Sequence, residues 1–260
     1  MIYDVKNLSL AYGGGPTVVD KACFKLSEGE TMTVLGPNGA GKSTLLNSLM
    51  GLHDPLSGEI CLCGSPINKQ SPRDIAKAVA YVRQQVSVAF SFEIIDFVVM
   101  GRAPRLGPFS RPRPEDYDKA MGALEAMDIA HLAHRPYSEV SGGQRQQAVI
   151  ARAVAQEPKA ILLDEPTAHL DFGNQIRTLE LARRLSDAGY AIIMTTHDPN
   201  HAMLMGGVTA ILDRTGRLTV GSCADMLTQE RLEELYRVEL RVMEIPEISR
   251  RACLNVNLSS

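Results

Sequence analysis

The chain has 260 residues, of which 45% are hydrophobic and 22% are charged. These values are typical of a folded globular protein and exclude a disordered chain or a fibrous repeat. Its 27 lysines and arginines face 30 aspartates and glutamates, which gives a net charge of −3. The chain therefore lacks the basic field that drives non-specific nucleic-acid binding, and we expect no nucleic-acid partner.

No targeting or membrane segment is expected. An uninterrupted apolar run of roughly 18 residues, the length of a membrane-spanning helix, is missing from the sequence. Residues 1–13 alternate like a strand and lack the basic start and apolar stretch of a secretory signal. Five cysteines without a CxxC pair indicate neither a disulfide framework nor a structural zinc site. We therefore expect the chain to stay in the cytoplasm.

The predicted elements begin with strands. Residues 2–10 and 22–26 alternate between apolar and polar side chains, which predicts an antiparallel layer. Met32–Leu35, Ala160–Leu163 and Ala191–Met194 are short apolar runs, typical of parallel strands that are buried on both faces. Each run is followed by a polar turn and helical periodicity. The sequence thus predicts an α/β fold with a mixed sheet, where ligands gather at the carboxyl ends of the parallel strands.

A helical insertion is expected between residues 86 and 157, with helices near 93–101, 115–128 and 142–156. Within it, Arg102–Pro114 holds four arginines, four prolines and no acidic residue. A proline-rich segment of this kind cannot form a continuous helix, so it is either a solvent-exposed surface loop or a docking edge for a partner. Further along, residues 230–237 are expected to be helical and residues 246–260 to form a polar tail.

The pattern G-x-x-x-x-G-K-[ST] follows the apolar run that ends at Leu35 and opens a helix, which is its required context. Its residues are Gly36, Pro37, Asn38, Gly39, Ala40, Gly41, Lys42, Ser43 and Thr44. In such a loop backbone N–H groups surround the β-phosphate of a nucleotide, and the helix presents its positive N-terminal end. Lys42 would reach the β and γ oxygens, and Ser43 would place its hydroxyl on Mg²⁺. We call residues 36–44 the glycine-rich loop.

A pair of acids directly follows another apolar run. Asp164 and Glu165 come after Leu163, and alternation along the strand should point the two side chains in different directions. Asp164 can then face Mg²⁺ through water, while Glu165 faces the attacking water as general base. Burial beside phosphate charge would raise the pKa of Glu165, which suits a base, although Mg²⁺ opposes that shift.

Three further side chains are candidates for the same edge of the sheet. His197 follows the run that ends at Met194, where a neutral imidazole can donate to the γ-phosphate as a sensor. Gln84, with Gln85 as the neighbouring candidate, can reach Mg²⁺ or water with its amide. Tyr12 can stack on adenine, although a tyrosine in this position taken alone is more often an ordinary strand aromatic.

A second anion-binding segment opens the helix expected near 142–156. Its residues are Ser141, Gly142, Gly143 and Gln144. The glycines free the backbone, and Ser141 can cap the helix or touch phosphate. Because one nucleotide does not need two such sites in one chain, we expect a two-fold pair in which this segment of one copy covers the nucleotide held by Lys42 of the other.

With these motifs in this order, the chain resembles the ATP-binding cassette (ABC) ATPases over residues 1–225. The resemblance covers Tyr12, the glycine-rich loop, Gln84, residues 141–145, Asp164 with Glu165, the loop of Leu170 and Asp171, and His197. Val140 stands where the family commonly has Leu, and His169 where Ser is frequent. The resemblance implies ATP and Mg²⁺ as cofactors, ATP hydrolysis, a homodimer that closes on ATP, and Asp171 as part of the nucleotide site.

The resemblance also implies four parts. Residues 1–85 and 158–225 form the nucleotide-binding core, residues 86–157 a helical subdomain that contacts a membrane subunit near Gln84, and residues 226–260 a C-terminal helix and tail. Residues 99–104 and 166–175 resemble the importer ATPases for iron-siderophore, haem, cobalamin and related metal or oxyanion uptake. This implies polytopic permease subunits, a periplasmic or extracellular substrate-binding protein, and a peripheral position on the cytoplasmic face of the cell membrane.

The alternative is a soluble ABC ATPase that acts on DNA or ribosomes. Such proteins usually carry two cassettes in tandem or a long heptad insertion, and neither fits this length. The sequence does not encode the cargo, because selectivity would lie in the membrane subunits and the binding protein.

Overall fold

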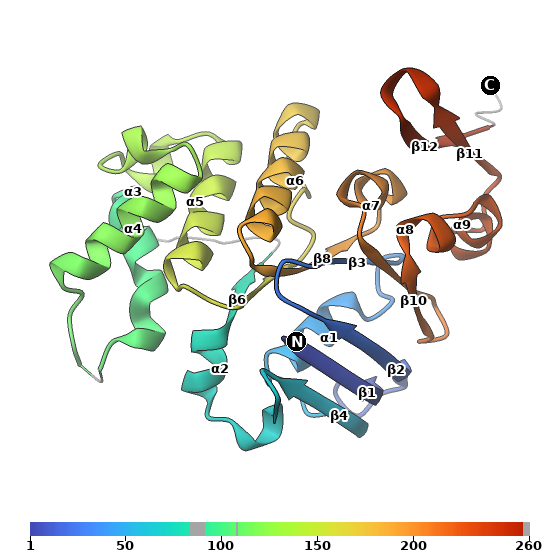
Figure 1. Cartoon of the computed structure of the whole chain (residues 1–260), viewed down its shortest axis with the longest axis horizontal. Helices are drawn as coiled ribbons and strands as arrows, with labels where there is room; N and C mark the ends of the chain where they lie inside the picture. The colour runs from blue at the N-terminus through green and yellow to red at the C-terminus, as the bar shows by residue number, and fades with distance from the viewer. Residues whose placement is uncertain (84–91, 108, 257–260) are drawn as a thin grey trace.

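The centre of the molecule is a six-stranded sheet, in a computed structural model that describes residues 1–83, 92–107 and 109–256 (Figure 1). The strand order is β10-β9-β3-β8-β7-β6, and neighbours are parallel except for β10, which pairs antiparallel with β9. The strands are β3 (Thr31–Leu35), β6 (Val79–Val82), β7 (Ala160–Leu163), β8 (Ala191–Thr196), β9 (Val208–Leu212) and β10 (Leu218–Ser222). The three apolar runs predicted as buried parallel strands are the neighbours β3, β8 and β7, so this prediction is confirmed.

A second, antiparallel sheet has the order β2-β1-β4-β5. Its strands are β1 (Tyr3–Ala11), β2 (Thr17–Leu26), β4 (Ser57–Leu62) and β5 (Ser65–Pro66). The antiparallel N-terminal layer is thereby confirmed, with β4 and β5 added to it. Helix α1 (Lys42–Leu49) links the two sheets, because its leucines share one buried cluster with side chains of β1 and β3.

Helices α3 (Ile94–Val99), α4 (Pro114–Ala126) and α5 (Gly142–Ala155) pack together beyond the β6 edge of the sheet (Figure 1). A 3₁₀ helix over Met100–Arg105 continues α3. These elements confirm the helices expected in the insertion, and their apolar faces join the buried cluster that covers β6 and β7. Before residue 223 the described residues also form α2 (Pro72–Ala78), α6 (Phe172–Asp187), α7 (Pro199–Met205) and short 3₁₀ turns at Ile67–Lys69, Ala130–Leu132 and Tyr137–Glu139. The domain boundaries given above stay predictions.

At its start the arginine-rich segment departs from the expected solvent-exposed loop, because Arg102 is buried, whereas the docking edge for a partner stays a prediction. The guanidinium of Arg102 is buried and lies 3.0 Å from Asp116 and 2.7 Å from Glu157. Arg105 donates to the carbonyls of Gln156 and Glu157. Both arginines therefore fasten the 3₁₀ helix to the end of α5, and only Arg102 is a buried cation that requires paired acceptors, since Arg105 is exposed.

The chain ends in a small unit that packs on the sheet edge. This C-terminal unit (residues 223–256) comprises α8 (Cys223–Met226), α9 (Gln229–Tyr236), β11 (Leu240–Ile245), a 3₁₀ turn at Pro246–Ile248 and β12 (Arg250–Asn255). The helix expected at 230–237 is confirmed as α9. The polar tail expected from residue 246 is wrong, because β12 pairs antiparallel with β11 along its whole length.

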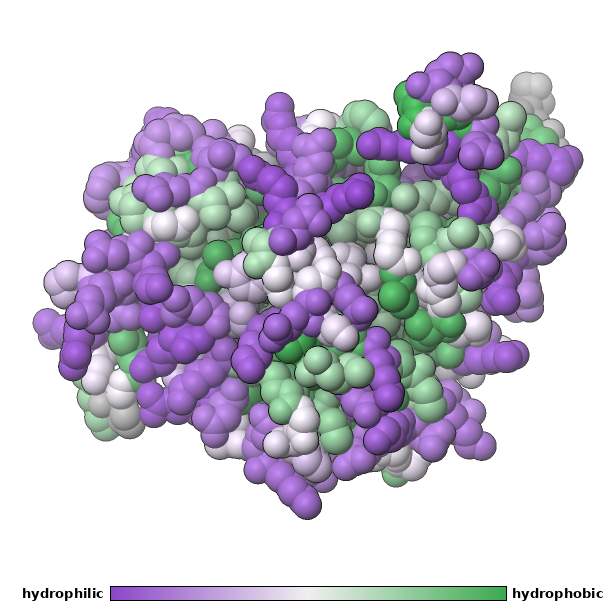
Figure 2. Space-filling model, viewed as in Figure 1, coloured by the Kyte–Doolittle hydropathy of each residue, from purple (hydrophilic) through white to green (hydrophobic). Residues whose placement is uncertain are grey.

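The hairpin formed by β11 and β12 exposes both apolar and polar side chains. On the face shown in Figure 2 it lies at the upper right, with apolar side chains beside hydrophilic ones. Its strands lack the clean alternation that marks a strand in a sequence, and their pairing was therefore visible only in the structure.

Among the described residues, none of the helices is both long and apolar enough to span a bilayer.

Candidate functional site

The glycine-rich loop connects the buried end of β3 to α1 and forms the wall of an open cavity of about 490 Å³. Gly41 caps α1 with φ 103°, a left-handed value, and a Cβ there would come within 3.0 Å of Val18. Glycine therefore suits this position on both conformational and steric grounds. The cavity is lined by Tyr12, Val18, Asn38, Gly39, Gly41, Lys42, Ser43, Thr44 and Glu165. Residues far apart in the sequence thus meet here as expected.

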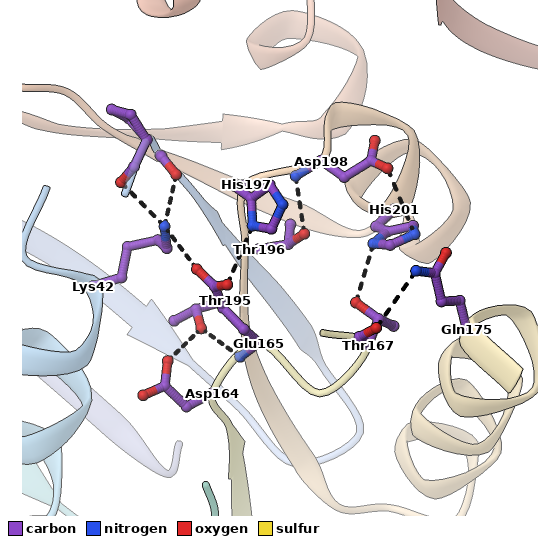
Figure 3. A network of polar contacts seen from close by, with 12 residues as sticks. Lys42, Asp164, Glu165, Thr167, Gln175, Thr195, Thr196, His197, Asp198 and His201 are labelled. Atoms are coloured by element: carbon purple, nitrogen blue, oxygen red, sulfur yellow. Dashed lines mark hydrogen bonds and ion pairs between the residues drawn. The ribbon is translucent and has the colours of Figure 1, made fainter. Parts of the chain in front are cut away.

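The ammonium group of Lys42 lies at the centre of this site. The side chain is buried, and Nζ donates to the carbonyls of Gly36 (2.7 Å) and Pro37 (3.1 Å). The same nitrogen lies 3.0 Å from Oε1 of Glu165 (Figure 3). The cation of the loop and the acid that follows β7 therefore form an ion pair across the cavity.

The two acids after β7 face different partners, as the sequence predicted. Asp164 accepts hydrogen bonds from the hydroxyls of Tyr81 (2.9 Å) and Thr195 (2.7 Å), whereas Glu165 faces Lys42. The cause differs from the expected alternation, because β7 ends at Leu163 and Glu165 has φ 44°. A left-handed backbone at a residue other than glycine is uncommon and is held by surrounding contacts.

Thr195 connects both acids to the neighbouring strand β8. Its hydroxyl donates to Asp164 and accepts from the backbone N–H of Glu165 at 2.9 Å (Figure 3). Thr195 and Tyr81 belong to this site without having been predicted from the sequence. The available signal was their place at the carboxyl ends of two apolar runs, but which strands are neighbours is decided by the sheet order.

The ionisation of Glu165 differs from the expectation that its pKa is raised. Burial raises the pKa, but the hydrogen bond and charge of Lys42, together with His197, outweigh it and hold the pKa below its usual value. His197 contributes through Nδ1, which lies 3.2 Å from Oε2 of Glu165. The correction follows from the ion pair, which stabilises the charged form of the carboxyl group.

Magnesium is compatible with the residues present. Mg²⁺ is usually held by one or two protein oxygens, with water and substrate phosphate completing its shell. Ser43 lines the cavity, and Asp164 is the buried neighbour of Glu165, with hydroxyl groups that fix both of its oxygens. The described part of the chain holds no cluster of three or more His, Cys, Asp or Glu side chains that would form a metal site by itself. Gln84 lies outside the described residues.

The predicted second anion-binding segment lies outside the Lys42 cavity of its own chain. Ser141 caps α5, accepting from the N–H of Gln144 at 3.3 Å, and Gln144 Oε1 accepts from the N–H of Ser141 at 3.0 Å. Both residues line a different cavity, beside α6. Gly142 is exposed and Gly143 is buried against Asn174. Within a single chain, residues 141–144 therefore lie apart from the cavity of the glycine-rich loop.

Asp171 also lies outside the Lys42 cavity, and its side chain caps α6. Its carboxylate accepts from the backbone N–H (2.9 Å) and the side-chain amide (2.7 Å) of Asn174. These hydrogen bonds lower the pKa of Asp171. Because Asn174 also packs against Gly143, the loop of Asp171 and the start of α5 are in contact.

Comparison with known proteins identifies the family and the fold. The family model described as "ABC transporter" matches residues 19–168. The chain is 41% identical to an uncharacterized ABC transporter ATP-binding protein of Haemophilus influenzae, with 91% of this chain and 90% of the relative covered. It is 36% identical to a molybdate import ATP-binding protein of the same organism (91% and 88% covered). It is also 38% identical to a hemin import ATP-binding protein of Nocardia farcinica (90% and 81% covered).

A solved structure of an ABC transporter shares the fold of this chain. A chain described as part of a metal-chelate type ABC transporter in an inward-facing conformation superposes with a TM-score of 0.86 at 34% identity. The match covers 98% of the present chain and 97% of the other. The fold of the described residues is therefore shared with a chain of that ABC transporter structure.

Proposed function

The chain belongs to the ABC transporter family, an ATPase family, and on that premise we propose that it is the ATP-hydrolysing subunit of a membrane importer. The observation that carries the proposal is the contact of Glu165, which lines the cavity, with both Lys42 (3.0 Å) and His197 (3.2 Å). A cation for phosphate and an ionised acid that can accept a proton from water suit ATP hydrolysis, and an imidazole can donate to a phosphate oxygen.

The glycine-rich loop binds the phosphates of ATP, and Tyr12, which is 74% exposed at the rim of the cavity, stacks on adenine. Ser43 and, through water, Asp164 would hold Mg²⁺, with Gln84 as a further candidate ligand, and the metal ion would supply positive charge beside the phosphates. Because Thr195 and Tyr81 fix the carboxylate of Asp164, that ligand is oriented before the nucleotide arrives.

Glu165 acts as the general base and His197 contacts the γ-phosphate. In the present structure the carboxylate is held ionised by Lys42. Phosphate oxygens compete for the same ammonium group, so nucleotide binding loosens the ion pair and raises the pKa of Glu165 toward the range of a base. Binding of ATP thereby frees the carboxylate to accept a proton from water.

Hydrolysis takes place in a two-fold pair of chains. The residues that one copy contributes to the nucleotide of the other are Ser141, Gly142, Gly143, Gln144 and Asp171. Support comes from the separation of the two cavities, since Ser141 and Gln144 line the one beside α6 and Lys42 lines the other. A head-to-tail arrangement joins each site to its missing half.

The importer handles an iron-siderophore, haem, cobalamin or related metal or oxyanion substrate. Two relatives support this class, one named for hemin import and one for molybdate import. They also favour an importer over a soluble ATPase that acts on DNA or ribosomes. The chain then works at the cytoplasmic face of the cell membrane with polytopic permease subunits and a periplasmic or extracellular substrate-binding protein.

Substitution of the base tests the chemistry. Glu165→Gln should keep ATP binding, trap a closed dimer and lower steady-state hydrolysis by about 10²–10⁴-fold. Glu93→Gln is the matched control, because Glu93 contacts His134 at 2.9 Å in a similar acid–imidazole pair outside the cavity. Rapid steady-state turnover by Glu165→Gln would exclude this residue as the base. Lys42→Ala should abolish ATP binding.

The two-fold pair has its own test. Ser141→Arg should permit ATP binding to the monomer and block ATP-driven dimerisation. Size-exclusion chromatography with ATP measures this for the Glu165→Gln variant with and without Ser141→Arg. A Ser141→Arg chain that still dimerises with ATP would contradict the shared site.

Purification from native membranes in mild detergent tests the transport assignment. Recovery of a polytopic subunit together with a substrate-binding protein supports the importer. Recovery of soluble DNA or ribosome factors alone would overturn the transport assignment and leave the ATPase chemistry intact.

A further inference from the structure

The C-terminal unit packs on the helix that follows His197. Helix α7 begins at Pro199, and its Ala202 belongs to a buried apolar cluster with Leu232 and Leu235 of α9. Leu35, the last residue before the glycine-rich loop, is part of the same cluster. In Figure 1, α7 lies between α6 and the C-terminal elements. The unit is thus joined to the part of the core that carries the candidate site.

Hydrogen bonds fix this junction on both sides of the start of α7. The hydroxyl of Tyr236, the last residue of α9, donates to the backbone carbonyl of His197 at 2.7 Å. The side-chain amide of Asn200 donates to the carbonyl of Cys253 (3.1 Å) and accepts from its N–H (2.8 Å). One contact therefore holds His197 itself, and a bidentate pair ties α7 to β12.

The imidazole of His197 depends on such support. Its side chain is 54% exposed and touches Glu165 on one side, so its direction follows the backbone that carries it. That backbone leaves β8 at Thr196 and enters α7, where Asp198 caps the helix by accepting from the N–H of Asn200. The carbonyl between these two ends is the group that Tyr236 holds.

We infer that the C-terminal unit is a positioning element of the hydrolytic site, with Tyr236 as the residue that holds His197 in register with Glu165. The inference rests on the proposed role of His197 at the γ-phosphate. Burial raises the pKa of Tyr236, so its hydroxyl stays protonated and remains a donor throughout the physiological pH range. The Asn200–Cys253 contact supports the same segment from β12.

Steady-state ATP hydrolysis by the full-length chain tests this. Tyr236→Phe removes one hydroxyl and keeps the ring, and it should lower kcat by about three- to tenfold with little change in the KM for Mg·ATP. Asn200→Ala should shift kcat in the same direction. Tyr3→Phe is the matched control, because the hydroxyl of Tyr3 also donates to a backbone carbonyl at 2.7 Å, at the far end of α1. It should leave kcat unchanged.

A double-mutant cycle separates positioning from a general loss of structure. In a His197→Gln background, Tyr236→Phe should have no further effect on kcat, since its action passes through the imidazole. A folded Tyr236→Phe chain with wild-type kcat, or a loss that is equally large without His197, would overturn the inference while leaving the ATPase proposal intact. A His197→Gln chain with wild-type turnover, or a wild-type chain without ATPase activity, would instead overturn the proposed function and this inference with it.

Discussion

The hydroxyl of Thr195 offers a direct test of how the candidate site is held together. Thr195→Val replaces the hydroxyl with a methyl group of similar size. The change leaves Oδ1 of Asp164 without its donor and the N–H of Glu165 without its acceptor. Thr195 is fully buried and Asp164 is 7% exposed, so water cannot readily replace the lost contacts.

The expected cost follows from these two groups. A buried polar group left without a partner costs about 1–3 kcal/mol, so the free energy of unfolding should fall by about 2–4 kcal/mol after allowing for non-additivity and the remaining contact from Tyr81. Thr195→Ser keeps the hydroxyl and should recover most of this loss.

Thr33→Val is the matched control. Thr33 lies on β3, directly beside β8, and is also fully buried, but its hydroxyl has no hydrogen-bond partner among the described residues. The same substitution there should change the free energy of unfolding by less than about 0.5 kcal/mol or stabilise the protein.

Urea denaturation monitored by circular dichroism measures the free energy of unfolding of the wild type and of Thr195→Val, Thr195→Ser and Thr33→Val. Equal losses for Thr195→Val and Thr33→Val would refute the argument, because the cost would then come from the strand position and not from the hydrogen bonds.

Two further predictions concern the helical part. Hydrogen bonds from Lys119 and Arg102 lower the pKa of Glu157 from 4.5 to about 2. The charged form of Glu157 therefore adds stability that is present above about pH 4.5 and is lost as the pH falls toward 2. In acid-unfolding curves, Glu157→Gln should lose less stability over that range than the wild type. Parallel curves for the two proteins would contradict this prediction. Gly101→Ala should destabilise by about 1–3 kcal/mol because its Cβ would lie 2.1 Å from the carbonyl oxygen of Arg152, whereas Gly122→Ala on an open face of α4 should stabilise by about 0.5–1 kcal/mol in urea titrations. Equal effects would refute the close-contact argument.

Local patterns in the sequence were sufficient for much of the fold and the site. The apolar runs before Gly36, Asp164 and His197 predicted parallel strands, and the glycine-rich loop predicted a phosphate site at their ends. Such inferences succeed because strand burial and loop conformation depend on residues that are close together in the chain. The ordered motifs also led to the ABC family, which the comparisons confirmed.

Other features depend on contacts between distant residues, and only the tertiary structure decided them. The sheet order brings Tyr81 and Thr195 to Asp164, the left-handed turn at Glu165 aims its carboxylate at Lys42, and that ion pair lowers a pKa that burial alone would raise. Arg102 is buried because Asp116 and Glu157 converge on it, and β12 exists because β11 offers a partner. In each case the outcome is set by charges or hydrogen-bonding groups that approach through space, whereas sequence patterns report only the preferences of neighbours along the chain.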